Sequence, residues 1–293
     1  MKMSTFAFVF QGLIGWSCCV NATATATATA APTEVSFPSL DASGGQAVVL
    51  KAFWTPAPAP ASGTKLSPAM VLLHGCGGPY NARGGLSQRM LDHTALLHRQ
   101  GMNVLVLDSL TPRGERELCT QKMGTRQVTM LQRRLDTLAA VAWLAAHARV
   151  DAKRIGLLGW SNGGSAVLST TNERHAELAA AAVKPSFAVA FYPGCDAELK
   201  RGYEHSARLL LLVGEADDWT PAAPCKRLAQ QAAGRVEIEA YPGAFHGFDS
   251  TAPVRLRKDV PNGVNPGRGV TVGGDPEALK MSRARLLQFI NMQ

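Results

Sequence analysis

The sequence has no long block of like charge, although its 293 residues carry a formal net charge of +8. Lysine and arginine are scattered along the chain, and the densest cluster, RLRKD at 255–259, is short. Aromatic residues make up only 6% of the chain, and none is interleaved with that cluster. Nucleic-acid-binding surfaces combine clustered cations with stacking aromatic side chains. We therefore predict no nucleic-acid partner and interpret the cluster as a solvated face.

Long apolar runs are also missing, except for a short one near the N-terminus. Lys2 is followed by the apolar stretch 4–20, which is too short to span a bilayer, and then by the tract NATATATATAAP. A positive start, a short apolar core and small residues at a cleavage site are typical of a secretory signal. We therefore predict a signal peptide over 1–24, a linker over 25–33, and a secreted or periplasmic protein with no stable membrane insertion after the signal is removed.

Cysteine is scarce, with six in the chain, and no two are spaced as C-x-x-C. This spacing argues against a zinc site, and we predict neither a metal nor a cofactor. Two cysteines fall in the predicted signal, and the other four are Cys76, Cys119, Cys195 and Cys225. An even number of cysteines in an exported protein favours disulfides, and four cysteines allow three pairings, which stay open at this stage.

Short apolar runs alternate with stretches of helical periodicity through the rest of the chain. The strand-like runs cover 34–40, 46–56, 69–75, 103–109, 154–161, 186–194, 208–218 and 235–243. The helical stretches cover 85–101, 127–148, a segment from Asn162 onward, and 275–290. This alternation predicts an α/β fold, a single domain over 34–293 with a mostly parallel central sheet and helices on both faces. In such sheets, functional side chains gather beyond the carboxyl ends of the strands.

The segment IGLLGWSNGGSAVL, residues 155–168, places a serine between two glycines where a strand-like run meets a helix-like one. In a G-x-S-x-G elbow, Gly159 and Gly163 let the backbone turn sharply while the hydroxyl of Ser161 projects outward. The amides at the start of the following helix then face developing negative charge. We predict that Ser161 is a nucleophile, and the alternative is an ordinary turn serine.

A serine nucleophile needs a base and a carboxylate that orients the base. The run LLLLVGEADDWTP delivers Asp217 and Asp218 directly after a strand, and the later loop YPGAFHGFD delivers His246 between two glycines. The order Ser, Asp, His is the one expected in α/β-hydrolases. We predict Asp217 as the acid and His246 as the base, with Asp218 as the alternative acid or as a cap for the helix near Pro221. Plain loop roles for these side chains are the remaining alternative.

The oxyanion of an acyl-transfer intermediate needs backbone donors. We predict one donor at the N–H of Asn162, the residue after the nucleophile. The other is the N–H of Cys76, in the glycine-rich loop HGCGG at 74–78. Two alternatives for Cys76 stay open. It could be the nucleophile, although it lacks the elbow context, or it could pair with Cys119 and brace the loop while still donating.

Three further residues lie where they could contact a substrate. Arg113, in DSLTPRGE, follows a strand at the functional edge and either binds a substrate carboxylate or forms a structural salt bridge. Trp160 and Trp219 flank the predicted nucleophile and acid, and they either line an apolar acyl pocket or pack in the core. The segment 250–276 is predicted to cross the surface as a long excursion that could shape the site.

Five motifs in this order, LLHGCGG, DSLTPRG, GLLGWSNGG, VGEADDWTP and AFHGFD, resemble the dienelactone hydrolase family of α/β-hydrolases. The resemblance covers about residues 45–292 and implies the α/β-hydrolase fold and ester chemistry. By this resemblance, Ser161 matches the nucleophile position of the family, Asp217 the acid and His246 the base. The chain departs from the namesake enzymes at the elbow, where they carry cysteine and this chain has Ser161.

Together these features predict an exported serine hydrolase that cleaves carboxylic esters through a Ser-His-Asp triad and an acyl-enzyme intermediate. Its expected partner is a small-molecule ester substrate. An acyltransferase or a polyester hydrolase on the same fold, and a non-catalytic binding protein, are the alternatives. The sequence leaves the identity of the substrate and the oligomeric state open.

Overall fold

The computed structural model describes residues 1–4, 31–42, 44–58, 66–232 and 234–292. The predicted signal peptide lies almost entirely outside the described residues, as does most of the predicted linker. Within the described ranges, no helix is both long enough and apolar enough to cross a membrane.

Eight strands form one sheet in the order β1-β2-β4-β3-β5-β6-β7-β8. Their bounds are β1 Thr33–Pro38, β2 Val49–Thr55, β3 Ser67–Leu73, β4 Asn103–Asp108, β5 Val150–Trp160, β6 Phe187–Phe191, β7 Arg208–Gly214 and β8 Val236–Tyr241. The pairs β1–β2 and β2–β4 are antiparallel, whereas all the pairs from β4 across to β8 are parallel. The sheet is therefore mostly parallel, as the sequence predicts, with an antiparallel edge.

The strands in the middle of the sheet carry almost no polar residues. β4 (NVLVLD) and β6 (FAVAF) are buried at every position. A strand that is covered on both faces has to be apolar on both faces, which is why these runs do not alternate. The edge strand β8 (VEIEAY) does alternate, and it is only partly buried between its two ends.

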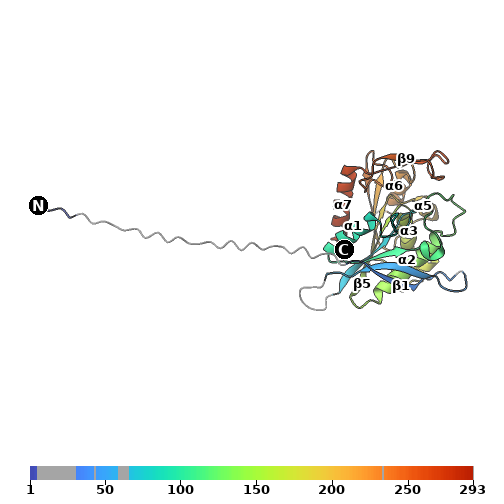
Figure 1. Ribbon diagram of the computed structural model, residues 1–293, viewed down its shortest axis with the longest axis horizontal. Coiled ribbons are helices and arrows are strands. Elements are labelled where there is room, and N and C mark those ends of the chain that lie inside the picture. Colours follow the sequence, from blue (N-terminus) through green and yellow to red (C-terminus); the bar gives the residue numbers. More distant parts are fainter. Residues whose placement is uncertain (5–30, 43, 59–65, 233, 293) are drawn as a thin grey trace.

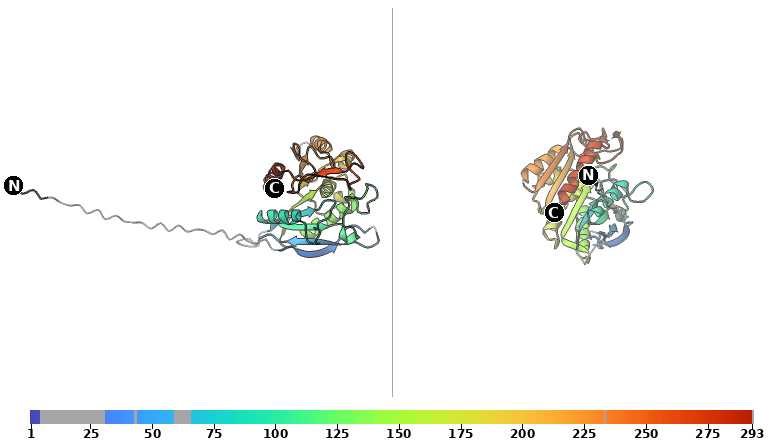
Figure 2. Two further views of the ribbon diagram at one scale, coloured as in Figure 1. Left: turned by 45° about the horizontal axis from the view of Figure 1, so that its top comes forward. Right: turned by 90° about the vertical axis from the view of Figure 1, so that its left-hand side faces the viewer.

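Helices cover both faces of the sheet. Their bounds are α1 Gln88–Arg99, the 3-10 helix η1 Thr111–Arg113, α2 Met130–Ala145, α3 Asn162–Thr171, α4 Ala176–Ala179, α5 Asp196–Arg201, α6 Ala222–Gln231 and α7 Pro276–Ile290. One hydrophobic cluster packs α2, α3 and α6 against one face, and a second packs α1 and α7 against the other. Figure 1 shows these two layers on opposite sides of the strands. In the right-hand view of Figure 2, the sheet runs from the blue strands at one edge to the orange strands at the other.

The segment predicted as a surface excursion contains a two-stranded hairpin. Its strands, β9 (Arg255–Arg257) and β10 (Val270–Val272), pair antiparallel. A β-bridge between His246 and Val272 also joins β10 to the loop of the predicted base. The excursion is therefore attached directly beside the candidate site.

Two disulfides join Cys76 to Cys119 and Cys195 to Cys225. This is the pairing in which Cys76 and Cys119 brace the glycine-rich loop, one of the three that the sequence leaves open. Disulfides persist in oxidising compartments, so both bonds are consistent with an extracellular location. The disulfide also overturns the alternative in which Cys76 is the nucleophile, because attack requires a free thiolate.

Candidate active site

Ser161 lies at a sharp turn between β5 and α3, where its backbone adopts φ 54° and ψ −116°. The two flanking glycines make this turn possible. A Cβ added at Gly159 would lie 2.3 Å from the carbonyl oxygen of Gly163. A Cβ added at Gly163 would lie 2.0 Å from the carbonyl oxygen of Leu73. A side chain at either position would collide with backbone, so the G-x-S-x-G spacing follows from the space available.

Three side chains from three different loops meet at the carboxyl ends of the strands. Nε2 of His246 lies 2.8 Å from Oγ of Ser161, and Nδ1 of His246 lies 2.8 Å from Oδ2 of Asp217. The three residues follow β5, β7 and β8. When Nδ1–H donates to the carboxylate, Nε2 carries a lone pair that accepts the serine hydroxyl proton. The structure thus brings together the residues predicted as nucleophile, base and acid.

The turn that follows Asp217 holds its carboxylate. Oδ1 accepts hydrogen bonds from the backbone N–H groups of Trp219 and Thr220, each at 2.8 Å. Oδ2 lies 3.0 Å from the Thr220 hydroxyl, beside its contact with His246. Asp217 is 4% exposed, so these donors replace water around a buried carboxylate. The role of Thr220 does not follow from a sequence motif, although an aspartate that binds the amides following it is a known turn pattern.

Asp218, the alternative acid, serves a different part of the molecule. Its carboxylate accepts hydrogen bonds from the backbone N–H of Thr271 at 2.7 Å and from the Thr271 hydroxyl at 3.0 Å. The prediction that Asp218 caps the helix near Pro221 is wrong, because α6 begins after Pro221 without a side-chain cap. Asp218 instead fastens β10 to the loop that carries Asp217.

Two aromatic rings hold the imidazole of His246. The ring centres of Tyr192 and Trp219 each lie 4.6 Å from that of His246. Trp219 lines two cavities beside Ser161. Trp160 is only 1% exposed and stacks on Phe191 at 5.8 Å, so it is mainly a core residue with one edge at one of these cavities.

A buried aspartate connects the aromatic residues. Asp249 accepts hydrogen bonds from Nε1 of Trp160 at 2.8 Å and from the hydroxyl of Tyr192 at 2.6 Å. Arg89 binds the same carboxylate through two nitrogens, at 3.0 and 3.2 Å. Burial opposes ionisation, but the charge of Arg89 and these hydrogen bonds hold the pKa of Asp249 below its ordinary value. Asp249 is the last residue of the motif AFHGFD, but neither its role nor that of Tyr192 follows from the sequence.

The two predicted oxyanion donors lie beside Ser161. Asn162 is the first residue of α3, so its N–H has no carbonyl partner within the helix. Nδ1 of His74 lies 2.7 Å from the carbonyl oxygen of Gly75. Because the Gly75–Cys76 peptide is trans, a carbonyl held by His74 directs the Cys76 N–H the opposite way. Cys76 and Ser161 line the same cavity.

A buried arginine connects the two segments that carry these amides. Nη2 of Arg133 donates to the carbonyl oxygen of His74 at 2.9 Å, and Nη1 donates to Oδ1 of Asn162 at 3.0 Å. Arg133 is 1% exposed, and burial lowers its pKa to about 10. Burial and the charge of Arg133 lower the pKa of His74 to about 3, so this imidazole is neutral. The neutral ring donates from Nδ1 to Gly75.

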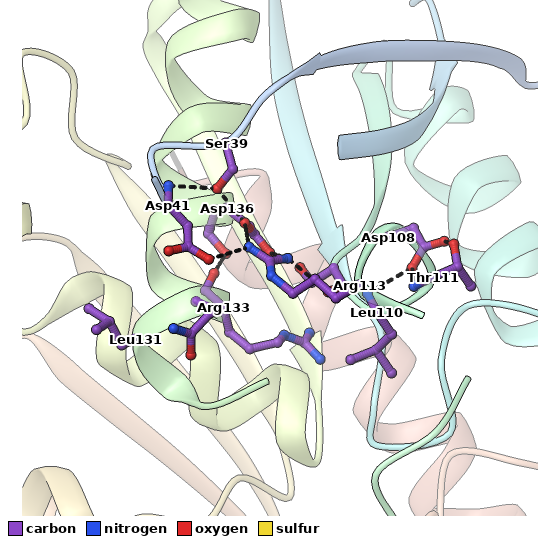
Figure 3. Close-up of polar contacts among 12 residues, drawn as sticks. Ser39, Asp41, Asp108, Leu110, Thr111, Arg113, Leu131, Arg133 and Asp136 are labelled. Atoms are coloured by element: carbon purple, nitrogen blue, oxygen red, sulfur yellow. Dashed lines mark hydrogen bonds and ion pairs between the residues drawn. The ribbon is translucent and has the colours of Figure 1, made fainter. Parts of the chain in front are cut away.

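Arg113 lies in a separate cluster of ion pairs. Its guanidinium donates to both carboxylate oxygens of Asp136, at 2.8 and 2.9 Å, and to Asp41 at 3.0 Å. Figure 3 shows this cluster, in which Ser39 donates a further hydrogen bond to Asp136. The structural salt bridge is therefore the role that the structure shows. The structure gives no support to a substrate-binding role for Arg113, because both Nη atoms are hydrogen-bonded within the protein, to Asp136, Asp41 and the carbonyl oxygen of Ser109.

Metal-binding side chains are not gathered anywhere in the part of the chain that the structure describes. No group of three or more His, Cys, Asp or Glu residues there is placed to hold an ion. Around Ser161 the polar groups are hydrogen-bonded to one another, as a hydroxyl, an imidazole and a carboxylate in a row. Such a row is suited to moving the serine proton to the imidazole, and hence to nucleophilic attack.

Three solved structures share this fold. A protein of Klebsiella pneumoniae subsp. pneumoniae, provisionally described as a dienelactone hydrolase, is 18% identical with a TM-score of 0.61, covering 90% of this chain and 100% of its own. A dienelactone hydrolase-like promiscuous phosphotriesterase from metagenomic libraries is 15% identical with a TM-score of 0.59, covering 90% and 99%. A thermophilic esterase of the Planctomycetes species Thermogutta terrifontis is 17% identical with a TM-score of 0.54, covering 87% and 94%.

Sequence comparison with family models gives a match over most of the chain. The model of the dienelactone hydrolase family matches residues 67–291. That range runs from the start of β3 to the end of α7, and it includes the elbow and the loops of Asp217 and His246. The chain therefore belongs to the dienelactone hydrolase family.

Proposed function

We propose that this chain is a serine hydrolase that cleaves carboxylic esters through Ser161, His246 and Asp217. The observation that carries the proposal is the hydrogen-bonded row in which His246 lies 2.8 Å from Ser161 on one side and 2.8 Å from Asp217 on the other. Membership of a hydrolase family, and an esterase and a phosphotriesterase among the proteins of similar fold, support hydrolysis of an ester bond.

The reaction follows from the positions of the three side chains. Oγ of Ser161 attacks the acyl carbon while its proton passes to Nε2 of His246. The ester carbonyl becomes a tetrahedral oxyanion, which the N–H groups of Asn162 and Cys76 stabilise. The intermediate collapses, the C–O bond to the alcohol breaks, and the alcohol oxygen takes the proton from His246. Asp217 holds the imidazole in the tautomer that accepts from the serine.

Water completes the cycle. It attacks the ester bond of the acyl-Ser161 intermediate while His246 takes one of its protons, and a second tetrahedral intermediate forms at the same amides. Collapse returns the proton from His246 to Oγ of Ser161 and releases the carboxylic acid. A buried imidazole that is held at both nitrogens is oriented for both proton transfers.

Replacement of Ser161 by alanine tests the proposal. Ser161→Ala is expected to fold normally and to lower the turnover of p-nitrophenyl acetate by about three to six orders of magnitude, because it removes the nucleophile. A fluorophosphonate probe should label the native protein and not the variant. Ser186→Ala, at an exposed serine directly before β6, is the control and should keep both activity and labelling. Hydrolysis that survives in Ser161→Ala would refute the proposal.

Two measurements distinguish the proposed hydrolase from the alternative functions. A binding protein without activity would not react with the fluorophosphonate. An acyltransferase would transfer the acyl group to an added alcohol at the expense of the free acid, which product analysis detects. We expect free acid as the main product.

We extend the proposal to export and domain organisation, with a signal over 1–24, a linker over 25–33 and one hydrolase domain over 34–293. The two disulfides support passage into an oxidising compartment. The single sheet, which is built from strands spread between Thr33 and Tyr241, supports one domain. N-terminal sequencing of protein secreted by a bacterial host should find a mature chain that begins near residue 25. A full-length chain outside the cytoplasm would contradict this.

A further inference from the structure

Two cavities meet at the proposed nucleophile. One has a volume of about 330 Å³ and the other about 450 Å³, and both are within the size range of ligand pockets. Cys76, Ser161 and Trp219 line both of them. An ester bound at Ser161 therefore has room for a group on each side of its carbonyl carbon.

The proton transfers decide which half of the ester lies in which cavity. The alcohol oxygen leaves with a proton from Nε2 of His246, so the alcohol group has to lie on the side of His246. His246, Gly247 and Val272 line the 330 Å³ cavity. Asn162, whose amide faces the carbonyl oxygen, lines the 450 Å³ cavity, and His246 does not. The acyl group therefore extends into the larger cavity.

The walls of the larger cavity are rich in apolar side chains. They come from segments that are far apart in the chain, and the apolar members are Met123, Met130, Ala197, Trp219, Pro261 and Pro266. Its charged members, Arg126 and Asp196, are of opposite sign. Such walls favour a hydrocarbon chain over a charged or strongly hydrated acyl group.

The segment 250–274 lines both cavities and is hydrogen-bonded to other parts of the fold. Asp218 binds Thr271 in β10, as described above. Oδ1 of Asn262 accepts from the N–H of Met123 at 3.0 Å, and Nδ2 of Asn262 donates to the carbonyl oxygen of Gln121 at 2.9 Å. This segment supplies Ala252 and Pro253 to the smaller cavity and Pro261 and Pro266 to the larger one.

We propose that the substrates are esters with a sizeable group on both sides of the scissile bond. An extended apolar acyl chain lies in the 450 Å³ cavity, and a bulky alcohol lies in the 330 Å³ cavity. Short esters such as acetates are accepted but leave the larger cavity filled with water. This inference rests on the proposed function and adds the substrate class to it.

Four esters and two substitutions test the inference. The esters are ethyl acetate, benzyl acetate, ethyl octanoate and benzyl octanoate, which vary the acyl and alcohol groups independently. Ala197 and Ala252 are both exposed. Of the two cavities at Ser161, Ala197 lines only the 450 Å³ cavity and Ala252 lines only the 330 Å³ cavity. Ala197→Trp fills part of the acyl cavity, and Ala252→Trp fills part of the alcohol cavity. Ala180→Trp, at an exposed site after α4, is the control for adding a surface tryptophan.

The native protein should show a kcat/KM for benzyl octanoate that exceeds the value for ethyl acetate by at least about 100-fold, since each buried methylene is worth about fourfold. Ala197→Trp should reduce the octanoate-to-acetate ratio by about tenfold or more and leave the benzyl-to-ethyl ratio unchanged. Ala252→Trp should do the opposite, and Ala180→Trp should change neither ratio. Ratios within one variant are independent of how much of the protein is folded.

Three outcomes would overturn the inference. A native protein with a higher kcat/KM for ethyl acetate than for the octanoates would show that the larger cavity does not bind the acyl group. Ratios that respond in the reverse order would place the alcohol in the 450 Å³ cavity and refute the assignment. Ratios that respond to neither substitution would show that neither cavity binds substrate, while the proposed function would stand. If the native protein hydrolysed none of the esters and did not react with a fluorophosphonate, the proposed function itself would fail.

Discussion

Arg133 is buried beside the glycine-rich loop 74–78, and in the part of the chain that the structure describes no carboxylate is hydrogen-bonded to it. Asp136, one turn further along α2, gives both of its oxygens to Arg113 instead. Figure 3 shows Arg133 leaving the same helix without joining that cluster. Burying a charge without an ion-pair partner costs several kcal/mol. The guanidinium is hydrogen-bonded to the segments of both His74 and Asn162, which indicates that the charge holds these two segments together.

Arg133→Met is expected to lower kcat by about 10- to 100-fold and to change KM by less than about threefold, because the oxyanion amides lose their common support and a nearby positive charge. The midpoint of thermal unfolding should stay the same or rise, since an apolar side chain replaces a buried cation. Arg134→Met is the matched control on the next residue. Arg134 binds Glu177 and Ser169, so this variant should lose stability and keep its kcat. A full kcat in Arg133→Met would contradict the role of Arg133.

Replacements of the adjacent residues Asp217 and Asp218 are likewise expected to have different effects. Asp217→Asn should lower kcat with p-nitrophenyl acetate by about three to four orders of magnitude, because an amide in place of the carboxylate favours the wrong imidazole tautomer. Asp218→Asn loosens the hairpin that Thr271 anchors, so it should act mainly on KM for large esters. Steady-state kinetics of the two variants would decide between the two aspartates. A larger loss of kcat in Asp218→Asn would identify Asp218 as the acid.

Among the elements, the disulfide between Cys76 and Cys119 fixes the glycine-rich loop that carries one of the two proposed oxyanion amides. It closes a sequence separation of 43 residues, and the other disulfide, between Cys195 and Cys225, closes 30. By loop-closure entropy each should contribute about 4 kcal/mol to the free energy of unfolding. The two bonds are therefore comparable in stability and different in position.

Replacing both cysteines of a pair by serine should destabilise the protein similarly in the two cases. Only the Cys76→Ser/Cys119→Ser variant should also lose kcat, by about tenfold, because its oxyanion loop becomes free to move. Urea denaturation and ester kinetics at a temperature where both variants are folded would measure the two effects separately. Equal kcat values in the two variants would show that the loop does not depend on its disulfide.

The elements that the sequence predicts best are the ones that continuous apolar runs define. The predicted strand 103–109 corresponds to β4, and the predicted helix 275–290 corresponds to α7. β5 begins at Val150, before the predicted start at 154, because its first part is polar and lies at the margin of the sheet. The short α4 and α5 were not predicted, since four and six residues are too few to show helical periodicity.

The residues of the site also differ in whether the sequence alone identifies them. Ser161, Asp217 and His246 are visible in the sequence because each belongs to a motif with a fixed spacing to glycine or to a strand end. Asp249 is not visible, since its main partner Arg89 is 160 residues away and only the packing of α1 onto the sheet brings them together. The hairpin is likewise invisible, because β9 and β10 have three residues each and depend on contacts from elsewhere.

The molecule as a whole should become less stable in mild acid. His74 and His93 are both buried, and burial lowers the pKa of each below the ordinary value of 6.5. Below pH 6.5 the unfolded chain therefore binds protons that the folded chain does not. The free energy of unfolding should fall as the pH drops from about 6.5 toward the folded-state values, by up to about 1.4 kcal/mol per pH unit for each histidine.

Urea denaturation between pH 7.5 and 4.5 would measure this slope. His93→Phe keeps an aromatic ring beside Trp160 and removes one of the three buried histidines, His74, His93 and His98, whose pKa is lowered, so its slope should be shallower than that of the native protein. The two proteins should differ little in slope above pH 7. An unchanged slope in His93→Phe would show that this imidazole does not resist protonation in the folded state.

Asp217 is hydrogen-bonded to the imidazole of His246, and the adjacent Asp218 is hydrogen-bonded to Thr271 in the hairpin beside the proposed site. Because the two aspartates are neighbours in the chain, the position of the proposed acid is coupled to the position of the hairpin. Mutations that remodel the hairpin to admit a new ester will disturb the alignment of the acid unless the bond to Thr271 is kept. Directed evolution of this protein should accordingly retain Asp218 and Thr271 while the residues around them diversify.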